Sequence, residues 1–105
     1  MIVSDILPNN TVAAAHYLLP GTAHAEKRGS FTNVKGRVQR FMKAVEPPGN
    51  ARPEWEFLHE LVFNVTGQNG FVSIEGLFNQ MAKEVPAFAA LTWASLGDQG
   101  ASVPI

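Results

Sequence analysis

The chain contains no cysteine among its 105 residues. Without thiolates it can form no disulfide, and it can hold neither an iron–sulfur cluster nor a cysteine-type zinc site. It also lacks any apolar run of about 18 residues, the length that a membrane-spanning helix needs. The formal net charge is only −1, so no overall field favours nucleic acid or a membrane surface. What remains is a chain with 46% hydrophobic residues, a content that is ordinary for a globular fold.

Charge of either sign is scarce but unevenly placed. Six of the eight Lys and Arg residues fall in Lys27–Lys43, whereas six of the nine acidic residues fall from Glu54 onward. Three histidines are present, at positions 16, 24 and 59, and no two of them lie three or four residues apart. Because a metal site needs several ligands brought together, we expect each histidine to be structural or solvated.

The basic stretch Glu26–Arg40 predicts a β-hairpin. Phe31 and Thr32 favour one strand, and Val38 and Gln39 favour the next. Between them, Gly36 can supply the positive φ that a tight hairpin turn requires. The basic residues of this hairpin have three alternative uses: a solvated or salt-bridged surface, a phosphate-contacting surface, or, with less support, a nucleic-acid surface.

The first 20 residues predict a strand, a short helix and a second strand. Met1–Leu7 and Tyr17–Leu19 are apolar runs, and Asn10 or Thr11 can cap a helix between them. This is a βαβ-like rhythm, although the crossover is too short for a complete unit. Pro20 and Gly21 end the second run.

Two helices are predicted in the second half of the chain. The first begins after Pro53 and ends at Gly67, and the second begins after Ser73 and ends before Pro86. Each carries an apolar stripe that we expect to be buried in the core. The stripes consist of Trp55, Leu58, Leu61, Val62 and Val65 in the first helix and Ile74, Leu77, Phe78, Met81 and Val85 in the second.

Two separated segments resemble one protein family. The run L-P-G-T-A-H-A-E-K-R-G-S-F-T-N-V-K-G-R-V-Q-R, Leu19–Arg40, resembles a signature of the molybdopterin oxidoreductase superfamily. The following A-V-E-P-P-G-N-A-R-P-E-W-E-F-L, Ala44–Leu58, is similar to a Pro-Pro-Gly segment in the large iron–sulfur subunit of NADH-quinone oxidoreductase, respiratory complex I. Both segments agree in order and spacing, so the chain is identified as similar to the C-terminal part of that large subunit.

The resemblance implies a set of cofactor-binding positions. In cofactor-bearing members a Thr-Asn-x-Glu-Gly-Arg motif lies beside the pterin dinucleotide, and it carries over to Thr32, Asn33, Gly36 and Arg37. The motif's glutamate is Lys35 here. The usual aspartate before Gly29 is Arg28. These changes from acid to base imply a vestigial site, and we expect no molybdopterin, iron or zinc in this chain and no catalytic residue.

The resemblance also implies a fold and a setting. We expect an α+β tail of an α/β molybdopterin-oxidoreductase-type domain, with a short sheet and a β-ribbon followed by two or three helices. The expected division is residues 1–45 for the end of that domain, 46–53 for a proline-rich linker, 54–97 for a helical segment and 98–105 for a frayed tail.

The expected role is scaffolding in the electron-transfer arm of an NADH:quinone oxidoreductase. Its partners would be the other subunits of complex I, without nucleic acid or membrane insertion, on the cytoplasmic side of the inner membrane. The parent subunit would carry iron–sulfur clusters. The alternative is the same tail of a molybdopterin-dependent oxidoreductase such as a formate dehydrogenase, where it would contribute to cofactor binding. A stand-alone binding module is the third possibility.

Overall fold

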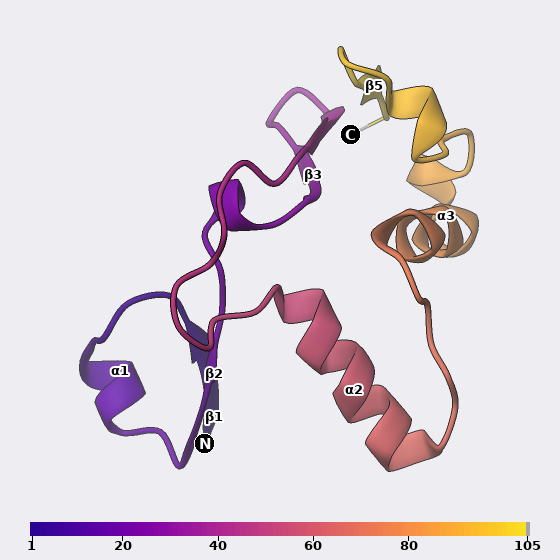
Figure 1. Ribbon diagram of the computed structural model, residues 1–105. Coiled ribbons are helices and arrows are strands. Elements are labelled where there is room, and N and C mark those ends of the chain that lie inside the picture. The colour runs from indigo at the N-terminus through magenta and orange to yellow at the C-terminus, as the bar shows by residue number, and fades with distance from the viewer. Residues whose placement is uncertain (105) are drawn as a thin grey trace. The chain divides into compact units, whose positions relative to one another are not determined.

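A computed structural model describes residues 1–104 of the chain. It consists of two compact units (Figure 1). The first unit combines Met1–Lys27 with Lys43–Gly70, and the second combines Arg28–Met42 with the residues from Phe71 onward. The hairpin segment thus belongs with the C-terminal helix and not with the residues that precede it in the sequence. The division expected from the sequence stays a prediction.

A parallel strand pair organises the start of the first unit. β1 (Ile2–Asp5) pairs with β2 (Tyr17–Pro20), with Ile2 opposite Tyr17 and Asp5 opposite Pro20. The short helix α1 (Asn10–Ala13) lies in the connection between them (Figure 1). Its N-cap is Asn9, whose Oδ1 accepts from the Val12 backbone N–H at 2.9 Å, and not Asn10 or Thr11 as the sequence suggested. All three side chains can cap a helix, so type alone could not choose between them.

The rest of the first unit is a short turn, an extended connection and a helix. The 3₁₀ turn η1 (His24–Glu26) presents the Ala25 carbonyl, which accepts from the backbone N–H groups of Ala44 and Val45 at 2.8 and 3.0 Å. Helix α2 (Glu54–Thr66) ends at Gly67, where a φ of 71° makes the left-handed C-cap that the sequence predicted.

The apolar stripe of α2 is not part of the core. No residue of this helix is buried, and Leu58, Leu61 and Val62 are each about half exposed, while Val65 is 76% exposed. The prediction of a buried stripe is therefore wrong within residues 1–104. Helical spacing fixes which side chains share a face, but it does not provide a second surface to cover that face.

The second unit contains the predicted hairpin. β3 (Gly29–Thr32) and β4 (Arg37–Phe41) are antiparallel, with Ser30 opposite Arg40, and Gly36 closes the turn with a φ of 73°. A third strand, β5 (Ala101–Ser102), pairs antiparallel with β4, which gives the order β3-β4-β5. The expected frayed tail is thus wrong for the described part of 98–105, because β5 adds backbone pairing and Val103 is buried.

Helix α3 (Ile74–Glu84) covers the core of the second unit. Ser73 caps it as predicted, with its Oγ accepting from the Gly76 backbone N–H at 3.1 Å, and the helix ends two residues before Pro86. Two 3₁₀ turns follow, η2 (Pro86–Phe88) and η3 (Ala94–Leu96). The core consists of Val38, Phe78, Ala82, Trp93, Leu96 and Val103.

The described residues contain no helix that is both long enough and apolar enough to span a bilayer.

Candidate functional site

A hollow of about 480 Å³ lies in the first unit at the carboxyl ends of β1 and β2. In sheets built from parallel strands, ligands commonly bind outside this end. The last residues of the strands and the residues just after them form one wall, and the extended connection before α2 forms the other. The lining residues are Asp5, Ile6, Leu7, Pro20, Gly21, Ala23, Glu26, Pro48, Asn50 and Ala51.

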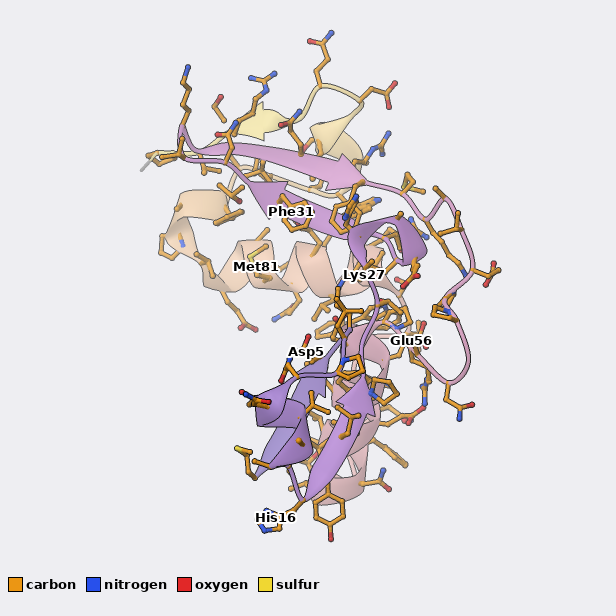
Figure 2. All side chains as sticks on the ribbon, turned by 90° about the vertical axis from the view of Figure 1, so that its left-hand side faces the viewer. Asp5, His16, Lys27, Phe31, Glu56 and Met81 are labelled. Atoms are coloured by element: carbon orange, nitrogen blue, oxygen red, sulfur yellow. The ribbon has the colours of Figure 1, made fainter. Side chains whose placement is uncertain are left out.

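Asp5 is the last residue of β1 and holds the turn that follows the strand. Figure 2 shows it at one end of the strand pair, with His16 at the opposite end. Its Oδ1 accepts from the Ile6 backbone N–H and its Oδ2 from the Asn9 side-chain amide, each at 2.7 Å. These hydrogen bonds, with that of Asn9 first, lower the pKa of the Asp5 carboxyl. A carboxylate offers about four acceptor positions, so Asp5 keeps capacity for the N–H or O–H groups of a ligand.

Glu26 supplies the second carboxylate of the hollow. Its Oε2 accepts from the Ala23 backbone N–H at 2.9 Å, which holds the side chain against the η1 turn. Among residues 1–104, no Lys or Arg lines this hollow. A lining with two carboxylates, an Asn and several apolar side chains suits neutral donor groups and rings, and it disfavours phosphate.

A polar cluster lies beside Gly21, one of the residues that line the hollow. The Lys27 Nζ donates to the Glu54 carboxylate at 2.7 Å. Burial is the largest single influence on the Glu54 carboxyl, and it raises the pKa. The hydrogen bond and the charge of Lys27, together with the backbone N–H groups of Glu54 and Thr22, lower the pKa by more, so the pKa of Glu54 is lowered overall. The neighbouring Thr22 is 2% exposed, and its buried hydroxyl has no hydrogen-bond partner within residues 1–104.

Gly21 lets these groups approach the backbone. A Cβ at this position would lie 2.7 Å from the Glu54 Oε1 and 3.2 Å from the Ser4 Oγ. A larger residue would therefore push the Glu54 side chain away from Lys27. The sequence alone indicates only that this glycine ends the strand, and the structure gives it a second role.

The four residues assigned to the cofactor by resemblance lie together at the tip of the hairpin in the second unit. Thr32 is the exposed last residue of β3. The Asn33 Oδ1 accepts from the backbone N–H groups of Lys35 and Arg37 at 2.9 and 3.0 Å. The Gly36 carbonyl accepts from the Val103 backbone N–H at 2.8 Å. The polar groups of Asn33 and Gly36 thus close the hairpin and attach the C-terminal strand, while their contact with a cofactor stays a prediction.

Arg37 is held by a backbone carbonyl of its own unit. Its Nε donates to the Gln99 backbone carbonyl at 2.9 Å. The acids of α2 are paired elsewhere, Glu54 with Lys27, and Glu56 and Glu60 with Arg52.

The histidines do not form a cluster. The His59 Nε2 accepts from the Gly70 backbone N–H at 3.1 Å, and His16 Nδ1 lies 2.5 Å from the amino group of Met1. His24 and Glu26 both belong to the 3₁₀ turn η1. Within the part of the chain that the structure describes, no three His, Asp or Glu side chains come close enough to hold a metal ion.

Sequence reasoning missed Asp5 and Glu26 as site residues. The available signal was an acid that directly follows a β-branched run in a predicted parallel strand, because such residues gather at the ligand-binding edge of a sheet. If that position is not taken into account, Asp5 indicates only where the first strand ends. Glu26 carries no comparable signal, since its position depends on the η1 turn.

Comparisons with known proteins identify the family of the chain. The molybdopterin oxidoreductase family matches residues 1–63, more than half of the chain. The chain belongs to this family. It is 40% identical over 91 residues to the NADPH-Fe(3+) oxidoreductase subunit alpha of Geobacter sulfurreducens. It is 38% identical over 105 residues to the F420-dependent formate dehydrogenase 2 subunit alpha of Methanococcus maripaludis, and 29% identical over 100 residues to formate dehydrogenase H of Escherichia coli.

The matches cover nearly all of this chain but a small part of each relative. They span 87%, 98% and 95% of the chain, in the order given, against 11%, 16% and 14% of the relatives. The similarity therefore concerns one segment of much longer proteins.

Proposed function

We propose that the chain is a segment of a molybdopterin-dependent oxidoreductase subunit of the formate dehydrogenase type. The observation that carries this proposal is the match to a formate dehydrogenase alpha subunit along 98% of the chain. This is the alternative interpretation of the sequence, and the relatives' names now favour it. The segment would contribute part of the cofactor-binding surface and would not be catalytic by itself.

The hollow beside Asp5 is the part of the segment that fits such a cofactor. Its place at the carboxyl ends of β1 and β2 suits a dinucleotide. Asp5 can accept hydrogen bonds from a base or a ribose, Asn50 can both accept and donate them, and the apolar walls can cover a ring. The absence of Lys and Arg from the lining favours phosphates outside the hollow. When bound, the cofactor would supply the redox chemistry, and this segment would only hold its nucleotide part.

A role in complex I is the second candidate. The run Pro47–Trp55, which resembles the large iron–sulfur subunit of that complex, favours it. In that setting the segment would scaffold an electron-transfer arm beside other subunits, near the cytoplasmic face of the inner membrane, and the family's cofactor site would be vestigial. Lys35 and Arg28, which stand where the family motif has acidic residues, are compatible with this role.

Formate-dependent dye reduction separates the two candidates. The polypeptide encoded by the complete reading frame should reduce a viologen dye when formate is supplied. Loss of molybdenum through growth with tungstate should lower this rate. A polypeptide that holds iron–sulfur clusters, lacks molybdenum and is inactive with formate would support the complex I role instead.

A further inference from the structure

The second unit has a hollow of its own, of about 440 Å³, which no proposed role uses. Its volume falls in the range of small-molecule sites, roughly 300–1,000 Å³. Arg28, Arg40, Glu75 and Asp98 line it together with the aromatic residues Phe41 and Trp93. Two guanidinium groups beside one hollow are the feature that points to a ligand.

Strand register explains why the two arginines line the same hollow. Ser30 of β3 lies directly opposite Arg40 of β4, and Arg28 precedes Ser30 by two residues. Side chains two residues apart point to the same face of a strand, so Arg28 and Arg40 are diagonal neighbours on one face of the hairpin. Long side chains in this relation can reach a common ligand.

Arg28 is held in place with its hydrogen bonds incomplete. Its guanidinium lies over the Trp93 ring, 5.7 Å from the ring centre, and its Nη2 donates to the Glu75 carboxylate. Its Nε is buried and has no partner in the described chain. Trp93 itself is 6% exposed, so it provides a fixed platform that limits where the guanidinium can move.

Arg40 is paired with a weakly held carboxylate. Its Nη2 donates to the Asp98 Oδ1 at 3.0 Å, and the Asp98 side chain is 97% exposed. An ion pair with so exposed a partner contributes little, because water and salt screen it. The Asp98 carboxylate therefore shows where an oxyanion can bind Arg40, and breaking this ion pair costs little free energy.

We propose that this hollow binds a small oxyanion, a phosphate or carboxylate group, which displaces Asp98 from Arg40 and bridges to Arg28. Guanidinium groups bind such oxygens in a planar, charge-assisted geometry that lysine does not reproduce. Glu75 stays on Arg28 and keeps that side chain oriented. The site uses only residues of the second unit and is independent of the function proposed above.

Tryptophan fluorescence of the full chain tests this site. A Trp55→Phe background leaves Trp93 as the reporter, and sodium phosphate is titrated against sodium chloride at constant ionic strength, with sodium acetate as a second probe. We expect a saturable change with at least one oxyanion. Phosphate alone would indicate a phosphoryl ligand, and both would indicate an oxyanion site of broad selectivity.

Three substitutions in this background identify the residues. Arg40→Met should weaken binding at least tenfold, whereas Asp98→Asn should strengthen it severalfold because the competing carboxylate is removed. Because the Asp98 side chain is exposed, its substitution should not disturb folding. The Asp98→Asn variant therefore tests the site even if Arg40→Met fails to fold. Lys35→Met, at an exposed cation of the same hairpin, should leave the affinity unchanged. No saturable change in the Asp98→Asn variant, or an equal loss in Lys35→Met, would overturn the proposal.

Discussion

Arg37 finds its partner 62 residues further along the chain, at the Gln99 backbone carbonyl. From charge alone, acidic side chains would be the expected partners of a cation. A backbone carbonyl has no signature in a sequence, so it could not be weighed against them. The sign of a residue's charge was thus predictable, but its partner depends on which groups the fold brings within hydrogen-bond distance.

The contact of Arg37 predicts a contrast between two conservative substitutions. Arg37→Lys removes the Nε donor and should destabilise the chain by about 1 kcal/mol. Lys35→Arg should change little, because the Lys35 side chain is exposed and has no partner in residues 1–104. Paired urea melts measure both changes. Equal effects near zero would show that the hydrogen bond to Gln99 contributes nothing to stability.

Glu54 predicts how the stability of the first unit depends on pH. Its pKa is lower in the folded chain than the ordinary value, with the upward influence of burial outweighed by Lys27 and backbone donors. Its contribution is therefore complete above the unfolded pKa and is lost as the pH falls through the folded pKa. We expect urea midpoints to fall from about pH 5 downward, and to fall less steeply in Glu54→Gln. An unchanged slope in that variant would exclude this carboxyl as the cause.

Among the elements, the hairpin and the capped helices were the most predictable. Gly36 and Gly67 have φ values of 73° and 71°, as their positions in the sequence required. The parallel pair β1–β2 also follows the predicted rhythm. Strand β5 was not predictable, because its two residues, Ala101 and Ser102, carry no strand signal and pair only through the backbone of β4.

The hairpin offers a matched test of its buried face. Val38 is 0% exposed in the core of the second unit, whereas Val34, in the turn region, is 91% exposed. Val38→Ala should destabilise the chain by about 2 kcal/mol, since the substitution leaves a cavity among packed side chains. Val34→Ala should change stability by less than about 0.5 kcal/mol. Denaturant melts that show similar costs for both would mean that the hairpin does not pack as described.

At the scale of the whole molecule, burial is unevenly shared. The buried apolar residues of the described chain, Val38, Phe78, Ala82, Trp93, Leu96 and Val103, all belong to the second unit. The first unit instead exposes Ile2, Leu7 and Tyr17 by 63–70% together with the stripe of α2. Its two parallel strands have no further strand beside them in residues 1–104, although parallel sheets are normally covered on both faces.

This distribution predicts the behaviour of the isolated chain. Exposed apolar strands and an uncovered helix face favour association, so the chain should form oligomers in solution or melt over a broad range. Light scattering combined with a thermal melt distinguishes the outcomes. A monodisperse monomer with one sharp two-state transition would contradict the burial described for the first unit.

Molybdenum content tests the proposed function most directly. The polypeptide encoded by the complete reading frame should purify with close to one molybdenum per chain by mass spectrometry. Asp5→Asn, which removes a carboxylate from the hollow at the ends of β1 and β2, should lower this content severalfold, whereas Asp98→Asn should not. A wild-type polypeptide without molybdenum would contradict the proposed function. Equal molybdenum contents of the wild type and Asp5→Asn would show that the hollow is not part of the cofactor site.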